Sequence, residues 1–251
     1  MQNDRIRILG AEMDPMTRDE VMAFTSARVA AGQKALVANH NLHSLALLGR
    51  DPEMARFYGL ADLVEIDSMP LVAWGRLLGR SVGREHRNTY LDWREDFWRL
   101  AAENRWRVFH LGCKPGVGVQ AIKVLSGRWP GVTFAERNGY FDTVGADNEA
   151  VLAQITAFAP NILFVGMGMP RQERWILANW DRLPTAVVFP IGAAFDYEAG
   201  AVPTPPRWAG RLGLEWMARF LVEPGRLFHR YFVEPWALVP AMVRDLTRRG
   251  S

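Results

Sequence analysis

The sequence predicts an α/β protein with a mostly parallel sheet, helices on both faces of that sheet and a helical appendage at the C-terminus. Short apolar runs of strand length recur along the first 200 residues, and helical patterns lie between most of them. Strands that alternate with helices form parallel sheets. After Gly200 the strand signals stop, and amphipathic helical patterns follow a proline-rich loop. We therefore expect residues 1–200 to form the α/β domain and residues 201–251 to form the appendage.

The predicted strands are apolar runs with the length and composition of buried strands. They are Ile6–Leu9, Ala35–Ala38, Leu63–Ile66, Val108–Leu111, Val132–Ala135, Ile162–Val165 and Ala186–Phe189. Ligands of parallel α/β sheets bind beyond the carboxyl ends of the strands. Glycine-rich or polar stretches follow several of these runs. We therefore expect a single ligand-binding cleft at that edge of the sheet.

Helices are predicted where apolar residues recur with helical spacing. Thr17 is expected to cap a helix that runs to about Ala31, with Glu20 as its capping-box partner. Further helices of the domain are expected at Tyr90–Ala101, at Val117–Leu125 and at Asp147–Phe158, the last capped by Asp147. Those of the appendage are expected at Leu212–Leu221, Arg226–Val233 and Ala237–Arg249.

The composition excludes a membrane-spanning protein and indicates an anionic partner. No run reaches the roughly 18 apolar residues that a span needs, and the N-terminus lacks an apolar signal core, so we expect a cytoplasmic protein. From Arg207 onward there are eight arginines against four acidic residues, in a chain of net charge +3. A basic, tryptophan-containing tail is typical of proteins that bind a lipid surface, a diphosphate or nucleic acid.

The stretch ILFVGMGMPRQERW (Ile162–Trp175) has the arrangement of a nucleotide phosphate site: a strand, a glycine turn and the start of a helix. Gly166 and Gly168 form the turn, but Arg171 replaces the third glycine of the dinucleotide fingerprint. We therefore expect a phosphate-bearing ligand other than NAD. A second turn of this kind lies at Gly112–Gly118. That turn fits an ordinary strand-to-helix connection equally well.

Carboxylates follow two other predicted strands. Asp67 comes directly after Leu63–Ile66, where it could act as a general base, although an N-cap or turn aspartate is the commoner role at such a place. Asp196 follows Ala186–Phe189 and could accept hydrogen bonds from a base or a ribose, or cap a turn.

The motif NHNLHSL follows the strand Ala35–Ala38. Asn39 and Asn41 are expected to line the cleft as polar donors. His40 and His43 invite a metal interpretation, but a metal site needs three or four ligands and no third imidazole or thiol has suitable spacing. The sequence therefore predicts no metal.

The appendage carries Arg219, Arg226 and Arg230, which the spacing puts on roughly one helical face. Pro224 and Gly225 must interrupt that helix. These arginines could form a solvated basic face or bind an anion.

Taken together, these segments resemble the WecG/TagA/CpsF glycosyltransferase family from about Ala35 to Tyr231. The matching motifs are GMGMPRQERW, GYFD at Gly139–Asp142, IGAAFDYEAG and GLEWMARFLVEPGRLFHRYF, in the family's order and spacing. The resemblance implies a Rossmann-like catalytic domain. It also implies inverting transfer of a sugar from a nucleotide sugar to a polyprenyl-diphosphate-linked sugar at the cytoplasmic membrane face, with neither a metal nor a cofactor.

The resemblance also implies roles for single residues. The family's catalytic aspartate falls on Asp67. Donor-binding positions, from the resemblance and from the cleft expected above, are Asn39, Asn41, Gly112, Tyr140, Gly166, Gly168, Gln172 and Asp196. Positions expected at the lipid diphosphate of the acceptor are Arg84, Arg219, Arg226 and Arg230.

Three departures from the family pattern lie near the sugar end of the expected cleft. Ser68 follows Asp67 where the family has glycine, Asn39 stands where it has threonine, and RNT at Arg87–Thr89 replaces Gly-Ser-Asp, with Arg84 at the preceding arginine position. These departures favour the exopolysaccharide branch, such as the xanthan-type β-glucosyltransferase, and therefore UDP-glucose as donor. A UDP-N-acetylmannosamine-type donor is the alternative, as is a non-catalytic nucleotide-binding protein on the membrane.

Other functions fit the sequence less well. A nucleotide-sugar oxidoreductase or epimerase needs a full dinucleotide fingerprint and a Tyr-x-x-x-Lys pair, and the sequence has neither. A nucleic-acid partner is not expected, because no recognition-helix motif is present and the basic residues of the tail alternate with bulky apolar ones. The apolar residues of the tail are compatible with a bilayer contact or with a homo-oligomer interface.

Overall fold

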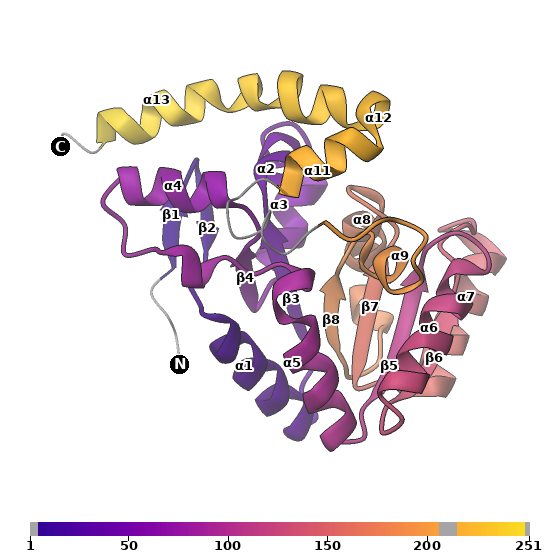
Figure 1. Ribbon diagram of the computed structural model, residues 1–251. Helices are drawn as coiled ribbons and strands as arrows, with labels where there is room; N and C mark the ends of the chain where they lie inside the picture. The colour runs from indigo at the N-terminus through magenta and orange to yellow at the C-terminus, as the bar shows by residue number, and fades with distance from the viewer. Residues whose placement is uncertain (1–4, 206–214, 249–251) are drawn as a thin grey trace.

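The fold is a parallel sheet between two layers of helices (Figure 1). The structure is a computed structural model that describes residues 5–205 and 215–248. Its six-stranded sheet has the order β4-β3-β8-β7-β5-β6, and every neighbouring pair is parallel. The strands are β3 (Ala35–His40), β4 (Leu63–Ile66), β5 (Arg107–Gly112), β6 (Thr133–Arg137), β7 (Ile162–Gly166) and β8 (Val187–Pro190). The predicted α/β class, with flanking and C-terminal helices, is confirmed.

Each face of the sheet is apolar and covered by helices, because successive side chains of a buried strand point to opposite faces. One face is covered by α1 (Arg18–Ala30), α5 (Tyr90–Glu103) and α6 (Val117–Arg128). The other is covered by α2 (Leu42–Leu48), α3 (Pro52–Gly59), α7 (Gly145–Phe158) and α8 (Arg171–Asn179). The short helix α9 (Ala194–Glu198) follows β8.

The N-terminal segment departs from the prediction. The run expected at Ile6–Leu9 does not join the parallel sheet but forms β1 (Ile6–Ile8), which pairs antiparallel with β2 (Ala11–Met13). The chain reverses at Leu9 and Gly10, both of which have positive φ, so the strand stops after three residues. This hairpin packs with α4 (Met69–Leu77) in a third apolar cluster.

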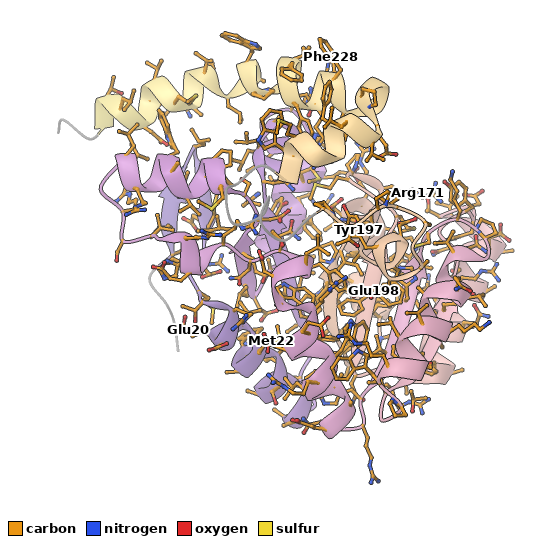
Figure 2. The ribbon with its side chains drawn as sticks, in the orientation of Figure 1. Glu20, Met22, Arg171, Tyr197, Glu198 and Phe228 are labelled. Carbon is orange, nitrogen blue, oxygen red and sulfur yellow. The ribbon has the colours of Figure 1, made fainter. Side chains whose placement is uncertain are left out.

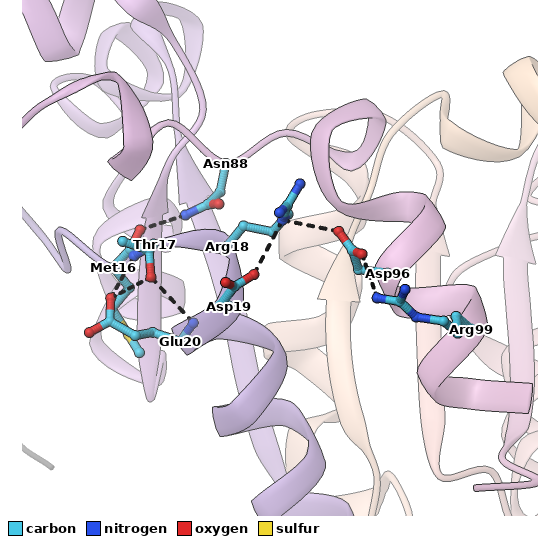
Figure 3. Close-up of polar contacts among 8 residues, drawn as sticks. All are labelled: Met16, Thr17, Arg18, Asp19, Glu20, Asn88, Asp96 and Arg99. Carbon is cyan, nitrogen blue, oxygen red and sulfur yellow. Dashed lines mark hydrogen bonds and ion pairs between the residues drawn. The ribbon is translucent and has the colours of Figure 1, made fainter. Parts of the chain in front are cut away.

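Of the two predicted helix caps, the one at Thr17 is confirmed and the one at Asp147 is wrong. Thr17 and Glu20 form the expected capping box: the Glu20 N–H donates to Thr17 Oγ1 and the Thr17 N–H donates to Glu20 Oε2 at 2.7 Å (Figure 3). The predicted cap at Asp147 is wrong, because α7 begins at Gly145 and its N-cap is Val144. Asp147 lies in the first turn instead, where its carboxylate accepts from the Asp142 N–H at 3.4 Å.

The C-terminal helices lie across α2 and α4 (Figure 1). They are α11 (Glu215–Val222), α12 (Pro224–Phe228), the π-helical turn η3 (His229–Val233), the 3-10 turn η4 (Glu234–Leu238) and α13 (Val239–Arg248). The expected interruption at Pro224 is present, since α11 ends at Val222. No helix in residues 5–205 or 215–248 is long and apolar enough to cross a bilayer.

Two buried or partly buried carboxylates hold the appendage against the α/β domain. Glu234 accepts from His43 Nδ1 and, at 2.8 Å, from Arg50 Nη2. Asp245 accepts from the Leu9 N–H at 2.7 Å and from Trp74 Nε1 at 3.2 Å. Whether residues 201–251 form a separate folding unit stays a prediction.

Three strand ends approach so closely that only glycine fits at two of them. A Cβ on Gly112 would lie 2.4 Å from the carbonyl oxygen of Gly166, and a Cβ on Gly166 would lie 2.6 Å from that of Gly192. Both contacts are with backbone atoms, which cannot rotate away. The carboxyl ends of β5, β7 and β8 are therefore packed backbone to backbone.

We predict that Gly166→Ala lowers the free energy of unfolding by about 1–3 kcal/mol, because its methyl group must displace the Gly192 carbonyl. A matched control is Gly127→Ala in α6, where an added Cβ meets nothing within 4 Å. That control is expected to raise the free energy of unfolding by about 0.5–1 kcal/mol. Urea titration followed by circular dichroism measures both, and equal effects of the two substitutions would contradict the close approach.

Candidate functional site

Asp67 lies at the carboxyl end of β4 and is held there by β3 and α2. Its N–H donates to the carbonyl of His40 at 2.8 Å, and its Oδ2 accepts from Asn41 Nδ2 at 3.1 Å. Asn41 is itself fixed as the N-cap of α2, where its Oδ1 accepts from the Ser44 N–H at 3.1 Å. The partly buried carboxylate of Asp67 therefore has a defined orientation at the edge where a ligand is expected.

The side chain of Asn39 links the ends of β3 and β8 by a hydrogen bond. Its Nδ2 donates to the carbonyl of Pro190, at the end of β8, at 3.1 Å. In the register of the sheet it lies opposite Glu65 of β4. The side chain is partly buried, so part of its surface still faces the edge of the sheet.

Glu65 is a buried carboxyl group that the sequence reasoning missed. Its side chain is 3% exposed, and its Oε1 has no hydrogen-bond partner among the described residues. Burial raises the pKa of Glu65 well above its ordinary value, and the negative charge of Asp67 raises it further. Burial therefore favours the protonated form of Glu65. The signal in the sequence was a glutamate inside the otherwise apolar strand LVEI.

Arg87, which the sequence reasoning did not assign to the site, lies beside the end of β4. Arg87 pairs as an isolated parallel bridge with Ile66, the residue before Asp67. Its guanidinium is almost buried and donates to Asp92 Oδ2 at 2.7 Å. Arg84 was expected at the acceptor diphosphate, but it is exposed, on the 3-10 turn η1 (Arg84–His86). The structure therefore brings Arg87, rather than Arg84, next to the strand that carries Asp67.

The buried side chain of Gln172 forms hydrogen bonds to two of the glycine turns. Its Oε1 accepts from the Gly168 N–H at 3.1 Å and from the Gly192 N–H at 3.2 Å, while its Nε2 donates to Glu173 Oε1 at 2.8 Å. Only 1% of Gln172 is exposed. The turns after β7 and β8 are thus joined by one amide, and a direct contact between this side chain and a nucleotide stays a prediction.

Asp196 and Tyr140 converge on the turn after β5. Asp196 Oδ2 accepts from Cys113 Sγ at 3.5 Å. Burial raises the pKa of Asp196, while the positive charge of Lys114 lowers it. The loop before Tyr140 lies against the same turn, because a Cβ on Gly139 would be 3.2 Å from the Gly112 Cα. The Tyr140 ring is exposed and offers an aromatic face on which a base could stack.

Burial raises the pKa of Cys113, so its thiol stays protonated and can serve as a hydrogen-bond donor. The neighbouring His110 is completely buried, with its ring stacked 3.8 Å from that of Phe195. Burial lowers the pKa of His110 to about 3, so this imidazole is neutral. The Cys113 thiol and the His110 imidazole, both close to the turn after β5, are therefore uncharged.

The appendage brings positive charge to the start of α8. Burial raises the pKa of Glu173 to about 7, and the positive charge of Arg230 acts in the opposite direction. The charge of Arg230 also lowers the pKa of His43. Arg219 and Arg226 lie in α11 and α12, and their side chains lie outside the part of the chain that the structure describes.

The two histidines of the NHNLHSL motif point in different directions. His40 is buried, stacks on Tyr58 with ring centroids 3.8 Å apart, and has its pKa lowered to about 3 by burial. His43 bonds to Glu234. In residues 5–205 and 215–248, no group of three or more His, Cys, Asp or Glu side chains is placed to hold a metal ion.

Comparison with known proteins assigns the chain to a family. The model of the glycosyl transferase WecG/TagA/CpsF family matches residues 6–251. The chain belongs to this family. Curated relatives from Staphylococcus aureus strains MRSA252 and NCTC 8325 / PS 47 are both 26% identical over 233 residues, which cover 89% of this chain and 87% of theirs. Both are named N-acetylglucosaminyldiphosphoundecaprenol N-acetyl-beta-D-mannosaminyltransferase.

The protein is therefore a glycosyltransferase. In this glycosyltransferase the edge of the sheet has two parts. Asp67 and Asn41 lie at the ends of β4 and β3, and the glycine turns lie at the ends of β5, β7 and β8. Three strand spacings separate β4 from β7, roughly 14 Å in all.

We predict that Glu173 makes the glycosyltransferase less stable as the pH rises. The folded protein holds the Glu173 proton up to about pH 7, whereas the unfolded chain releases it above the ordinary value of 4.5. Stability is thus lost between about pH 4.5 and pH 7, by up to about 3 kcal/mol. The glutamine of the Glu173→Gln variant cannot ionise. As the pH rises across this window, the free energy of unfolding of the variant should therefore rise relative to that of the native protein. Urea titrations from pH 4.5 to 8 measure this, and a constant difference would contradict the prediction.

Proposed function

We propose that this glycosyltransferase moves a sugar from a nucleoside-diphosphate sugar, a UDP-sugar, to a polyprenyl-diphosphate-linked sugar, with inversion at the anomeric carbon and with Asp67 as general base. The main support is the carboxylate of Asp67, which Asn41 orients at the same sheet edge as the glycine turns. A base and a phosphate-binding surface along one edge are what such a transfer requires.

In the proposed reaction, Asp67 takes the proton of the acceptor hydroxyl as that oxygen attacks the anomeric carbon. The bond between this carbon and the diphosphate oxygen breaks on the opposite face, and its electron pair leaves with the diphosphate. An α-linked donor thereby gives a β-linked product, as the names of the relatives specify for their own product. Backbone N–H groups at the glycine turns, other than those of Gly168 and Gly192 that donate to Gln172, would stabilise the departing charge.

The burial of Glu65 supports the assignment of Asp67 as the base. Two neighbouring carboxyl groups resist ionising together, and burial favours the proton on Glu65 rather than on the partly exposed Asp67. Asp67 then carries the negative charge that a base needs. Tyr140 and Asp196, at the other end of the edge, would contact the uridine, and Gly112, Gly166 and Gly168 would hold the diphosphate.

An N-acetylmannosamine-type donor is favoured, with an N-acetylglucosaminyl-diphosphate lipid as acceptor. The relatives carry this activity in their names and match nearly the whole chain. UDP-glucose, which the sequence analysis favoured, is the second candidate. It is supported by the residues beside Asp67, where the Ser68 hydroxyl is buried without a partner among the described residues.

The appendage is proposed to rest on the cytoplasmic face of the cell membrane. Many of its large apolar side chains are exposed, among them Trp216, Leu221, Phe228, Phe232, Trp236 and Val243. Phe228 lies on the side of the appendage turned away from the sheet (Figure 2). Aromatic and aliphatic side chains of this kind favour the bilayer interface. Arg230, and the helix positions of Arg219 and Arg226, would then face the acceptor diphosphate.

We predict that Asp67→Asn lowers kcat by about 10²–10⁴-fold, because the amide cannot accept the hydroxyl proton. Affinity for UDP, measured by calorimetry, should change less than threefold, since Asp67 is remote from the glycine turns. Asp181→Asn, on the exposed turn after α8, is the matched control and should keep its kcat. Activity of Asp67→Asn within tenfold of the native value would exclude Asp67 as the base.

The donor is tested by following UDP release with UDP-N-acetylmannosamine, UDP-glucose and UDP-glucuronate. Each donor is paired with an N-acetylglucosaminyl and with a glucosyl polyprenyl-diphosphate analogue. Turnover with UDP-N-acetylmannosamine on the N-acetylglucosaminyl lipid is expected. Turnover with UDP-glucose alone would instead support the second candidate. Release with none of these donors, together with absent UDP binding, would contradict the proposed function.

A further inference from the structure

A basic hollow lies at the far end of α4, away from Asp67. It has a volume of about 450 Å³. Its lining comes from the last turn of α4 and the loop that follows: Arg76, Gly79, Arg80, Ser81, Val82, Gly83, Arg84, Glu85 and His86. Helix α4 begins two residues after Asp67, so its nine residues put the hollow roughly 13 Å along the helix from the proposed base. The hollow is thus separate from the edge of the sheet where the donor is expected.

Three arginines contribute to the lining of this hollow. Arg76, Arg80 and Arg84 form no ion pair with any acidic residue in the described part of the chain. The one acid in the lining, Glu85, has an exposed side chain. Unpaired guanidinium groups around one hollow match the oxygens of a phosphate group, to which each can donate two hydrogen bonds.

The loop that carries these arginines is packed rather than loose. Val82 is buried against α4, so closely that a Cβ on Gly75 would lie 2.7 Å from Val82 Cγ1. The Arg80 N–H donates to the Gly75 carbonyl at 2.9 Å, and the Gly83 N–H donates to His86 Nδ1 at 2.8 Å. A backbone fixed in this way sets the positions from which the arginine side chains extend, so the loop itself need not be ordered when a ligand binds.

The helix that ends at the hollow is also in contact with the appendage. Helix α13 is fastened to α4 by the bond from Trp74 Nε1 to Asp245, and it runs along α4 (Figure 1). Val239, Val243 and Leu246 recur at helical spacing on α13 and are exposed. An apolar stripe with cationic groups at its edge is the arrangement that holds a helix in the interface of a negatively charged bilayer.

We propose that this hollow binds the phosphate of an anionic phospholipid headgroup and so fixes the orientation of the enzyme on the membrane. The inference rests on the proposed placement of the appendage at the membrane. The apolar stripe supplies affinity for any bilayer, whereas the hollow supplies preference for anionic lipid. Each arginine near such a surface contributes about fivefold in affinity.

The test compares the full-length protein with the double variant Arg76→Gln/Arg80→Gln in sedimentation with vesicles. The vesicles contain phosphatidylcholine alone or with phosphatidylglycerol. The variant is expected to bind the phosphatidylglycerol vesicles at least tenfold more weakly, with less than twofold change on phosphatidylcholine alone. The matched control is Arg105→Gln/Lys123→Gln, which removes the same charge from two exposed positions outside the hollow and the appendage. The affinity of this control variant for both kinds of vesicle should stay within twofold of that of the native protein.

Equal losses in the double variant and the control would overturn the proposal, because net charge alone would then account for binding. Calorimetry with inorganic phosphate and pyrophosphate separates a lipid headgroup from a free anion. A loss of phosphate binding in the double variant, without a loss of vesicle binding, would make the hollow a free-anion site and would also overturn the proposal. UDP binding by the native protein is measured in parallel. Its absence would count against the proposed function and leave the vesicle comparison intact.

Discussion

The close approach of three backbone segments at the carboxyl ends of β5, β7 and β8 is the constraint on which the site depends. Gly112 and Gly166 leave no room for a side chain, and the Gln172 amide joins the turns at Gly168 and Gly192 from within the protein. A side chain at either of the first two positions would push the strand ends apart and move the backbone donors with them. The proposed phosphate-binding surface is therefore a property of the sheet packing rather than of one loop.

Burial decides where charge is carried along this edge. Glu65 and Asp67 are two residues apart at the end of one strand. Burial raises the pKa of Glu65 and so favours its protonated form, whereas Asp67 is partly exposed. The same effect keeps His40 and His110 neutral. Glu173 is poised near neutrality, where the charge of Arg230 from the appendage opposes the effect of burial. The charge of Arg230, in the appendage, thus acts on the pKa of Glu173 at the start of α8.

The appendage is held in place by polar contacts and by apolar residues such as Leu238 and Met242, which pack in the cluster formed by the N-terminal hairpin and α4. Glu234 is bonded to His43 and Arg50, and Asp245 is bonded to Trp74 and to the backbone of Leu9. Much of its apolar surface is left facing outward. Such a division suits a segment that must hold its orientation relative to the sheet while presenting its other side to a lipid surface.

The sequence by itself determined the α/β class, six of the sheet's strands to within about two residues, the capping box of α1 and the family, because these depend on local periodicity, capping chemistry and motif order. Tertiary structure alone decided that Ile6–Ile8 pairs in a hairpin, that Gln172 is a buried brace, and that Arg87 rather than Arg84 adjoins the end of β4. Each of these depends on contacts between segments far apart in the chain. Neither residue spacing nor amino-acid type carries that information, since burial and partners are set only when the sheet and its helices come together.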